Sequence, residues 1–226
     1  MKPDSTMQTE ENPVLPPVDR VDRLGIVGYG EVGRIFAAGL RKAGVSDVAV
    51  WDLKFIDPAK GPEPLAHAQV AGVVAADSVA ALCAGRQLIV SAVTASNTLA
   101  VAEAVAPHIE PHAVFLDLNS ASPGTKQRAA ALIDAAGAHY VEAGVMTSVP
   151  PYGIRVPMLL GGAHAAALAA VLTGWGMDAK PVSEQLGVAS AIKMCRSVMI
   201  KGLEALVIES YATARHYGVQ DHVLPT

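Results

Sequence analysis

A glycine-rich turn constrains the fold of this chain more than any other segment. The residues Gly28-Tyr29-Gly30-Glu31-Val32-Gly33 directly follow a strand-like stretch at Asp22–Gly28 and open a helical pattern that runs from Glu31 to Ala43. A second strand-like run, Val48–Asp52, ends in an acid nineteen positions after Gly33. Glycines at these three places permit a tight turn, the approach of a phosphate to the backbone, and close packing of helix on strand. The segment therefore predicts a dinucleotide site within a strand-helix-strand unit.

The same segment indicates which residues would hold the cofactor. Amide groups in the first helical turn, together with the helix dipole, would bind the phosphates. Asp52 would accept hydrogen bonds from the ribose hydroxyls, and its charge disfavours a 2′-phosphate, so NAD is expected rather than NADP, although Lys54 would soften that preference. The expected cofactor-binding residues are Gly28, Tyr29, Gly30, Glu31, Val32, Gly33 and Asp52.

The rest of the chain continues the alternation of strand and helix. Short apolar runs predict strands near residues 72–75, 88–93, 114–118, 140–143 and 158–160, and helical patterns lie at 78–84, 97–109, 125–136 and 164–172. Strands that are apolar on both faces and alternate with helices are typical of a parallel sheet covered on both sides. We expect a Rossmann-type, doubly wound α/β domain with a mostly parallel sheet over residues 21–183, preceded by a disordered tail at residues 1–20.

The pattern changes in the C-terminal segment, residues 184–226. From Gly187 to Tyr217 it reads as one long helix with apolar residues on nearly every face. Such a helix needs a cover, so either another subunit packs on it or the chain lacks a C-terminal domain. We expect this segment to be the interdomain helix and the start of an all-helical domain, and the protein to form a homo-oligomer, a dimer, through it.

Composition and charge exclude several classes of partner. The 226 residues carry 17 Lys and Arg against 21 Asp and Glu, with no basic run, so the chain lacks the electrostatic attraction that binding to nucleic acid or an anionic membrane needs. The histidines have no metal-ligand spacing, and no metal is expected. Cys83 and Cys195 lie in apolar surroundings, and both are expected to be buried packing residues in a reducing compartment. A small molecule is the expected partner.

One long uncharged stretch calls for a test of the membrane alternative. No Asp, Glu, Lys or Arg occurs between Val156 and Met177, but Gly161-Gly162 interrupts this stretch. A buried strand followed by a core-facing helix explains the stretch better than a membrane span does. The first twenty residues carry charges and prolines and no apolar core of a signal peptide, so a cytoplasmic protein is expected.

The order of motifs resembles the β-hydroxyacid dehydrogenase family, which includes 3-hydroxyisobutyrate and 6-phosphogluconate dehydrogenases. The resemblance covers most of residues 22–217. Within the family, the chain is similar in general appearance to the branch that is named after phosphogluconate dehydrogenase by similarity alone. The segments that carry it, besides the glycine turn, are Leu88–Val93, Asp117–Pro123, Met158–Gly162 and Gly187–Lys193. The family segment D-x-S-T-x-x-P corresponds to Asp117–Pro123, and G-x-G-x-x-x-K-x-x-x-N corresponds to Gly187, Ala189, Lys193 and Ser197.

The resemblance implies roles for individual residues. Lys193 would be the catalytic lysine at the start of the interdomain helix, and Ser91, Ala92 and Val93 would lie near the middle of the cofactor. The segment at Asn119 and Ser120 would flank the nicotinamide and the substrate. The family substrate loop D-x-P-V-S-G-G is replaced here by Glu142–Ser148, so the substrate does not transfer from the family. The expected substrate-binding residues are Asn119, Ser120, Met146, Thr147, Ser148, Ser197 and Lys201.

Lys193 also stands out without the family. It lies in an otherwise uncharged segment, Leu186–Cys195, where burial of a lysine is costly. Hydride transfer from an alcohol needs a base on the hydroxyl, and a lysine with a lowered pKa can serve. Ser197 and Lys201 fall near the same helix face, where they could orient a substrate. The alternative is a lysine that extends from an apolar helix to the surface.

Together these features predict an NAD(P)-dependent oxidoreductase of the β-hydroxyacid dehydrogenase type, acting on a small hydroxy acid or its carbonyl counterpart. Two alternatives stay open. An imine reductase uses the same scaffold, and a non-catalytic dinucleotide-binding sensor or interaction module would bind the cofactor without turnover.

Overall fold

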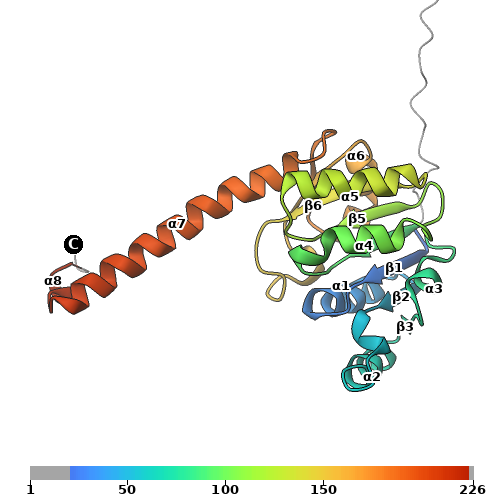
Figure 1. Ribbon diagram of the computed structural model, residues 1–226, viewed down its shortest axis with the longest axis horizontal. Coiled ribbons are helices and arrows are strands. Elements are labelled where there is room, and N and C mark those ends of the chain that lie inside the picture. Colours follow the sequence, from blue (N-terminus) through green and yellow to red (C-terminus); the bar gives the residue numbers. More distant parts are fainter. Residues whose placement is uncertain (1–20, 224–226) are drawn as a thin grey trace, which may run out of the picture.

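The computed structural model describes residues 21–223 and contains one eight-stranded sheet between two layers of helices, from which one long helix extends (Figure 1). The strand order is β3-β2-β1-β4-β5-β6-β7-β8. This is the expected Rossmann-type doubly wound architecture. The tail expected at residues 1–20 lies outside the described residues, and the domain boundary placed at 183/184 stays a prediction.

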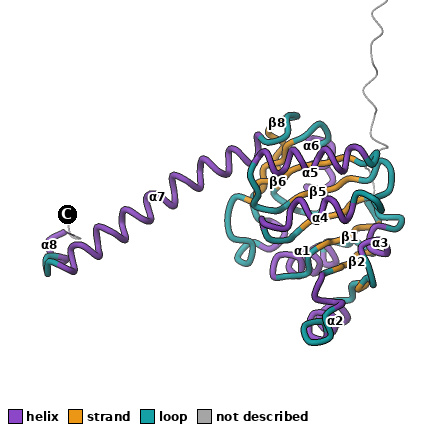
Figure 2. The backbone as a smooth tube through the Cα atoms, viewed as in Figure 1, coloured by secondary structure: helices purple, strands orange, loops and turns teal. Residues whose placement is uncertain are grey.

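The strands and helices alternate along most of the chain (Figure 2). The strands are β1 Arg23–Val27, β2 Asp47–Trp51, β3 Val74–Ala75, β4 Leu88–Ser91, β5 Val114–Asp117, β6 His139–Val145, β7 Met158–Gly161 and β8 Ala179–Ser183. The helices are α1 Glu31–Lys42, α2 Pro62–Val70, α3 Val79–Cys83, α4 Thr98–Val105, α5 Pro123–Ala135, α6 Ala165–Gly174, α7 Val188–His216 and α8 Gln220–Val223, with short 3₁₀ turns η1 Leu53–Ile56, η2 Ala95–Asn97 and η3 Gly153–Arg155.

Two apolar cores cover the two faces of the sheet. On one face, α1 and α6 pack through residues such as Phe36 and Leu168 against alternate strand residues such as Ile26. On the other face, α3, α4 and α5 pack through residues such as Ile133 against Phe115 and its neighbours. Because successive strand residues point to opposite faces, the inner strands must be mostly apolar, and Ser91, Asp117 and Glu142 are the buried polar exceptions on β4, β5 and β6.

One strand departs from the parallel pattern, and two elements were not predicted. Strand β7 pairs antiparallel with β6, whereas the other neighbouring pairs are parallel. Strand β8 and helix α2 were not expected from the sequence. Edge strand β8 buries only Ala179, and α2 buries only Pro64 and Ala68, so neither carries the apolar periodicity by which such elements are recognised.

Helix α7 begins on the sheet and then leaves it (Figure 1). Ala189 and Ser190 are buried in its first turn, whereas its later large apolar side chains, such as Met194, Leu203 and Ile208, are exposed. Cys195 lies on this exposed part, so the expectation that it is a buried packing residue is wrong, because the helix has already left the body of the domain. Cys83 is buried as expected, and burial raises the pKa of its thiol to about 11. Self-association through α7 stays a prediction.

The uncharged stretch from Val156 to Met177 forms strand β7 and helix α6, as expected. Over residues 21–223, no helix combines the length and apolar character that crossing a membrane requires. The cytoplasmic location stays a prediction.

Candidate active site

The glycine turn lies between the carboxyl end of β1 and the first residue of α1. Gly28 has φ of 94°, and a Cβ there would lie 2.4 Å from the carbonyl oxygen of Ala92. A Cβ on Gly33 would lie 1.9 Å from the carbonyl oxygen of Gly28, whereas none of the described atoms lies within 4 Å of a Cβ on Gly30. Gly28 and Gly33 are therefore required by packing, and Gly30 leaves the backbone open to a ligand.

A cleft of about 670 Å³ opens beside this turn, where the strand order reverses between β1 and β4. In open α/β sheets, ligands bind in this crevice at the carboxyl ends of the strands. Gly30 is the N-cap residue of α1 and has no side chain that could bind the amides of the first turn. These amides therefore stay available to an anion. Of the expected cofactor residues, the cleft is lined by Gly28, Gly30, Glu31, Val32, Asp52, Ala92 and Val93.

Asp52 follows β2 and is fixed in the wall of this cleft. Its Oδ2 accepts a hydrogen bond from the amide of Tyr29 at 2.7 Å, and its Oδ1 accepts one from the amide of Lys54 at 2.9 Å. The carboxylate thus also ties the glycine turn to the end of β2. Because a carboxylate has about four acceptor positions, it keeps capacity for ligand hydroxyls.

Three expected cofactor residues support the cleft from below and do not line it. Tyr29 is fully buried, and its hydroxyl lies 3.0 Å from Nδ1 of His67 on α2. Gly33 packs within the turn. Ser91 is buried, and its hydroxyl accepts a hydrogen bond from the side-chain amide of Asn119 at 2.9 Å.

A second cleft of about 350 Å³ adjoins the first, and both are lined by Glu31, Val32, Ala92, Val93 and Thr94. Five of the expected substrate and catalytic residues also line it: Asn119, Ser120, Thr147, Ser148 and Lys193. Met146, Ser197 and Lys201 are not in its wall. The carbonyl of Met146 accepts a hydrogen bond from Arg196, and Lys201 pairs with Glu204 on the exposed part of α7, so the substrate roles of these residues stay predictions.

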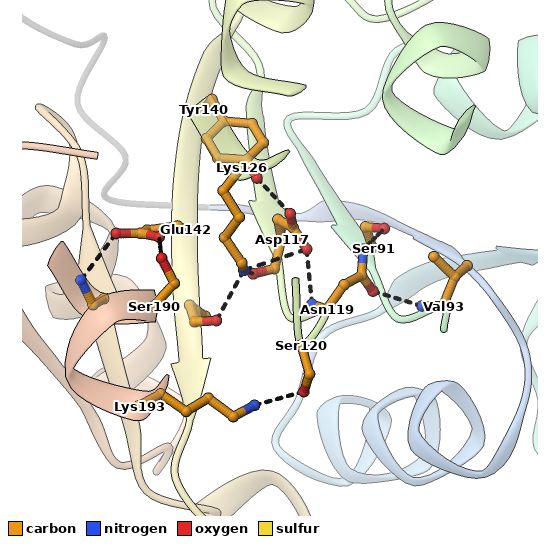
Figure 3. Close-up of polar contacts among 12 residues, drawn as sticks. Ser91, Val93, Asp117, Asn119, Ser120, Lys126, Tyr140, Glu142, Ser190 and Lys193 are labelled. Carbon is orange, nitrogen blue, oxygen red and sulfur yellow. Dashed lines mark hydrogen bonds and ion pairs between the residues drawn. The ribbon is translucent and has the colours of Figure 1, made fainter. Parts of the chain in front are cut away.

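Lys193 reaches from α7 across to the loop after β5. Its Nζ donates a hydrogen bond to the hydroxyl of Ser120 at 2.6 Å (Figure 3). The side chain is half-buried, and this burial lowers its pKa below the usual lysine value. The charge of Lys126 lowers that pKa further, while Asp117 opposes the shift. The neutral amine, which can accept a proton, is therefore favoured relative to an exposed lysine.

A buried polar network under this loop was missed in the sequence analysis. Lys126 on α5 is 1% exposed, and its Nζ donates to the carbonyl oxygens of Asp117 at 2.9 Å and Ala143 at 3.1 Å, and lies 3.6 Å from Asp117 Oδ1 (Figure 3). Tyr140 donates to the other carboxylate oxygen of Asp117. The available signal was a lone lysine on a helix face that otherwise carries buried alanines and Ile133.

Asn119 belongs to the same network. Its backbone amide donates a hydrogen bond to Asp117 Oδ1 at 2.7 Å, and its side-chain oxygen accepts one from the backbone amide of Val93 at 2.7 Å. With its side chain also bonded to Ser91, Asn119 links the ends of β4 and β5. Its side chain therefore fixes the junction of the two clefts.

Glu142 on β6 holds the start of α7. Its Oε1 accepts hydrogen bonds from the amides of Gly187 at 2.7 Å and Ala189 at 3.0 Å, and its Oε2 accepts from the hydroxyl of Ser190 at 2.7 Å. A carboxylate at a helix N-terminus satisfies otherwise unpaired amides and interacts favourably with the helix dipole. This contact sets the direction in which α7 presents Lys193.

Residues 23–172 match the family model described as the NAD-binding domain of 6-phosphogluconate dehydrogenase. The chain belongs to this family. The resemblance to β-hydroxyacid dehydrogenases is thereby confirmed, and the domain is an NAD(P)-binding domain of the dehydrogenase and reductase type.

Two solved structures are similar in sequence as well as in fold. A conserved hypothetical protein from Sinorhizobium meliloti is 40% identical, with a TM-score of 0.78 over 91% of this chain and 69% of that chain. The conserved protein MTH1747, of unknown function and described as similar in structure to 3-hydroxyacid dehydrogenases, is 29% identical, with a TM-score of 0.73 over 90% of this chain and 74% of that chain.

More distant structures share the fold alone. The 3-hydroxyisobutyrate dehydrogenase of Mycobacterium tuberculosis, solved with L-serine, is 20% identical, with a TM-score of 0.72 over 87% of this chain and 66% of that chain. An imine reductase from Myxococcus stipitatus in complex with NADP⁺ is 23% identical, with a TM-score of 0.71 over 87% of this chain and 67% of that chain, and a variant of that reductase binds NAD⁺.

Proposed function

We propose that this protein is an NAD(P)-dependent oxidoreductase that transfers a hydride between the nicotinamide and a small hydroxy acid or its carbonyl counterpart, with Lys193 as the acid-base group. One observation carries the proposal. Lys193 and Ser120 line a cleft that shares a wall with the cleft at the glycine turn. The proposed acid-base group therefore lies next to the predicted cofactor site, which supports the proposal, because hydride transfer to or from an oxygen-bearing carbon is accompanied by proton transfer.

The larger cleft fits a dinucleotide. Its volume lies within the range of small-molecule sites, Gly30 leaves the backbone open, and the first-turn amides of α1 are uncapped. These amides would hold the phosphates and Asp52 would bind the ribose. When bound, the nicotinamide supplies the hydride or accepts it.

Lys193 would manage the proton of the reacting oxygen. In the oxidising direction, its neutral amine takes the proton from the substrate hydroxyl, and in the reducing direction its ammonium returns a proton to the carbonyl oxygen. Ser120 holds Nζ in place through the 2.6 Å hydrogen bond. Thr147 and Ser148, which are exposed in the wall of the same cleft, are available to bind the substrate.

The acid-base role is tested with Lys193→Ala, Lys193→Arg and the matched surface variant Lys180→Ala. Cofactor affinity should change little in all three, because the glycine turn and Asp52 lie on other elements. Turnover should fall roughly 10²- to 10⁴-fold for Lys193→Ala and should not recover in Lys193→Arg, since a guanidinium stays protonated. Near-normal turnover of Lys193→Ala would refute the role of this lysine, and cofactor binding without turnover on a broad substrate panel would favour a sensor.

We further propose that NAD is preferred over NADP. The carboxylate of Asp52 is held in the cleft wall by two backbone amides, so it cannot easily turn away from a 2′-phosphate. Calorimetric titration should show tighter binding of NAD, and Asp52→Asn should narrow the difference. Equal or tighter binding of NADP to the unmodified protein would contradict this assignment.

The wall of the smaller cleft also favours a second candidate, an imine reductase. Its side chains from residues 21–223 include one cation, Lys193, and no arginine, and the other polar ones, apart from Glu31, are hydroxyls and the amide of Asn119. A substrate carboxylate would thus find little charge to pair with, whereas a ketone or imine needs none. Reduction of a ketone mixed with an amine, while hydroxy acids stay inert, would select this candidate.

A further inference from the structure

Lys126 is the one lysine among residues 21–223 that is fully buried. Its ammonium donates hydrogen bonds to two backbone carbonyls and forms an ion pair with the Asp117 carboxylate, whose Oδ1 lies 3.6 Å away. Burial of an ion pair costs free energy that an apolar side chain of similar volume would not. Packing alone therefore does not explain why a lysine occupies this position.

The surroundings of Lys126 connect it to Lys193 in two ways. Both lysines bind the segment Asp117–Ser120, Lys126 through Asp117 and Lys193 through Ser120. Both also meet the same point on β6, since Lys126 donates to the carbonyl of Ala143 and a Cβ on Gly144 would lie 3.5 Å from Cβ of Lys193. Figure 3 shows the two side chains approaching this strand from different elements.

We propose that Lys126 is a positioning residue whose positive charge lies behind Lys193 and disfavours a second positive charge there. Burial lowers the pKa of Lys126, whereas the charges of Asp117 and Glu142 oppose that shift and favour its ammonium form. This inference rests on the proposed acid-base role of Lys193. The ion pair between Lys126 and Asp117 is neutral as a whole, but its two charges act on Lys193 with opposite signs. The cation has the larger effect on the pKa of Lys193, and the anion partly offsets it.

The test measures the pKa of Lys193 directly, without substrate or cofactor. Trace acetylation with acetic anhydride across a pH series, followed by mass spectrometry of the Lys193 peptide, reports the fraction of neutral amine. Lys126→Met should raise the midpoint of Lys193, because the cation is lost. Asp117→Asn should lower it, because the offsetting anion is lost. A purely structural role would not give shifts of opposite sign.

Three further variants secure the result. The neutral pair Lys126→Met with Asp117→Asn leaves no unpaired buried charge, and its midpoint should lie above that of the unmodified protein and below that of Lys126→Met. Lys126→Arg keeps the cation and should not raise the midpoint, and Lys180→Met should leave it unchanged. If Lys126→Met fails to fold, the neutral pair and Asp117→Asn carry the test.

An unchanged Lys193 midpoint in both the single variant and the neutral pair, or shifts in the same direction for Lys126→Met and Asp117→Asn, would overturn the inference. Failure of the proposed function has a different signature, because Lys193→Ala would then keep its turnover whatever its titration in the other variants. Where turnover is established, the acid limb of kcat/KM against pH should move in step with the Lys193 midpoint.

Discussion

Removal of the Glu142 carboxylate should detach the first turn of α7 from the sheet. Its oxygens accept hydrogen bonds from two buried backbone amides, those of Gly187 and Ala189, and from the hydroxyl of Ser190. In Glu142→Leu, the Ser190 hydroxyl keeps a partner in the carbonyl of Gly187 at 3.1 Å, so the two amides are the groups left unpaired. At about 1 to 3 kcal/mol for each unsatisfied buried group, the free energy of unfolding should fall by about 2 to 6 kcal/mol.

Glu142→Gln is the matched variant. Its side-chain oxygen can still accept both amides, and its NH₂ group can donate to the Ser190 hydroxyl, so the main loss is the interaction of the charge with the helix dipole, up to about 1 to 2 kcal/mol. Glu184→Leu controls for a new leucine, because Glu184 is exposed and such surface changes usually stay within about 0.5 kcal/mol.

Urea denaturation gives the free energies, and native-state hydrogen exchange of the Gly187 and Ala189 amides reports the local effect. The amides should exchange faster in Glu142→Leu than in Glu142→Gln. If Glu142→Leu loses no more stability than Glu142→Gln, the Glu142 side chain does not anchor the start of α7. In that case this contact does not set the orientation of Lys193 either.

Two other predictions concern the glycine turn and the histidines near the first residue of β6. Gly33→Ala places a Cβ 1.9 Å from the carbonyl oxygen of Gly28, and such overpacking should destabilise the turn by about 1 to 3 kcal/mol. Calorimetric titration should therefore show weaker cofactor binding. Gly124→Ala, in open space on α5, should leave binding unchanged; equal effects of the two variants would dismiss the packing argument. His139 and His164 lie with ring centroids 4.0 Å apart, and burial lowers the pKa of both below 6.5, helped at His139 by the neighbouring His164 and His112. Because the unfolded chain then binds more protons, stability should be full above about pH 6.5 and fall as the pH drops below it. His139→Gln should flatten this dependence in thermal denaturation, and identical slopes would speak against it.

The sequence by itself determined the type of sheet and the position of the glycine turn beside which the larger cleft opens. The reasons are local: Gly28–Gly33 joins a strand to a helix with backbone geometry that its own residues dictate, and apolar strands such as β4 must be covered on both faces. Lys193 could also be singled out, because a charge in an apolar segment is conspicuous along the chain. The edge elements α2 and β8 escaped prediction, since each buries too few side chains to leave a periodic signal.

Only the tertiary structure decided what surrounds these residues. Lys126, Asp117 and Tyr140 are separated along the chain, and their network exists because β5 and β6 pair in parallel, with Asp117 opposite Glu142, and α5 packs on them. The arrangement of β4 and β5 makes Asn119 a link between strands. Cys195 is exposed because α7 has left the body of the domain, although the apolar sequence around it had indicated burial. Burial and charge coupling depend on contacts between residues that are distant along the chain, and sequence periodicity does not reveal these contacts.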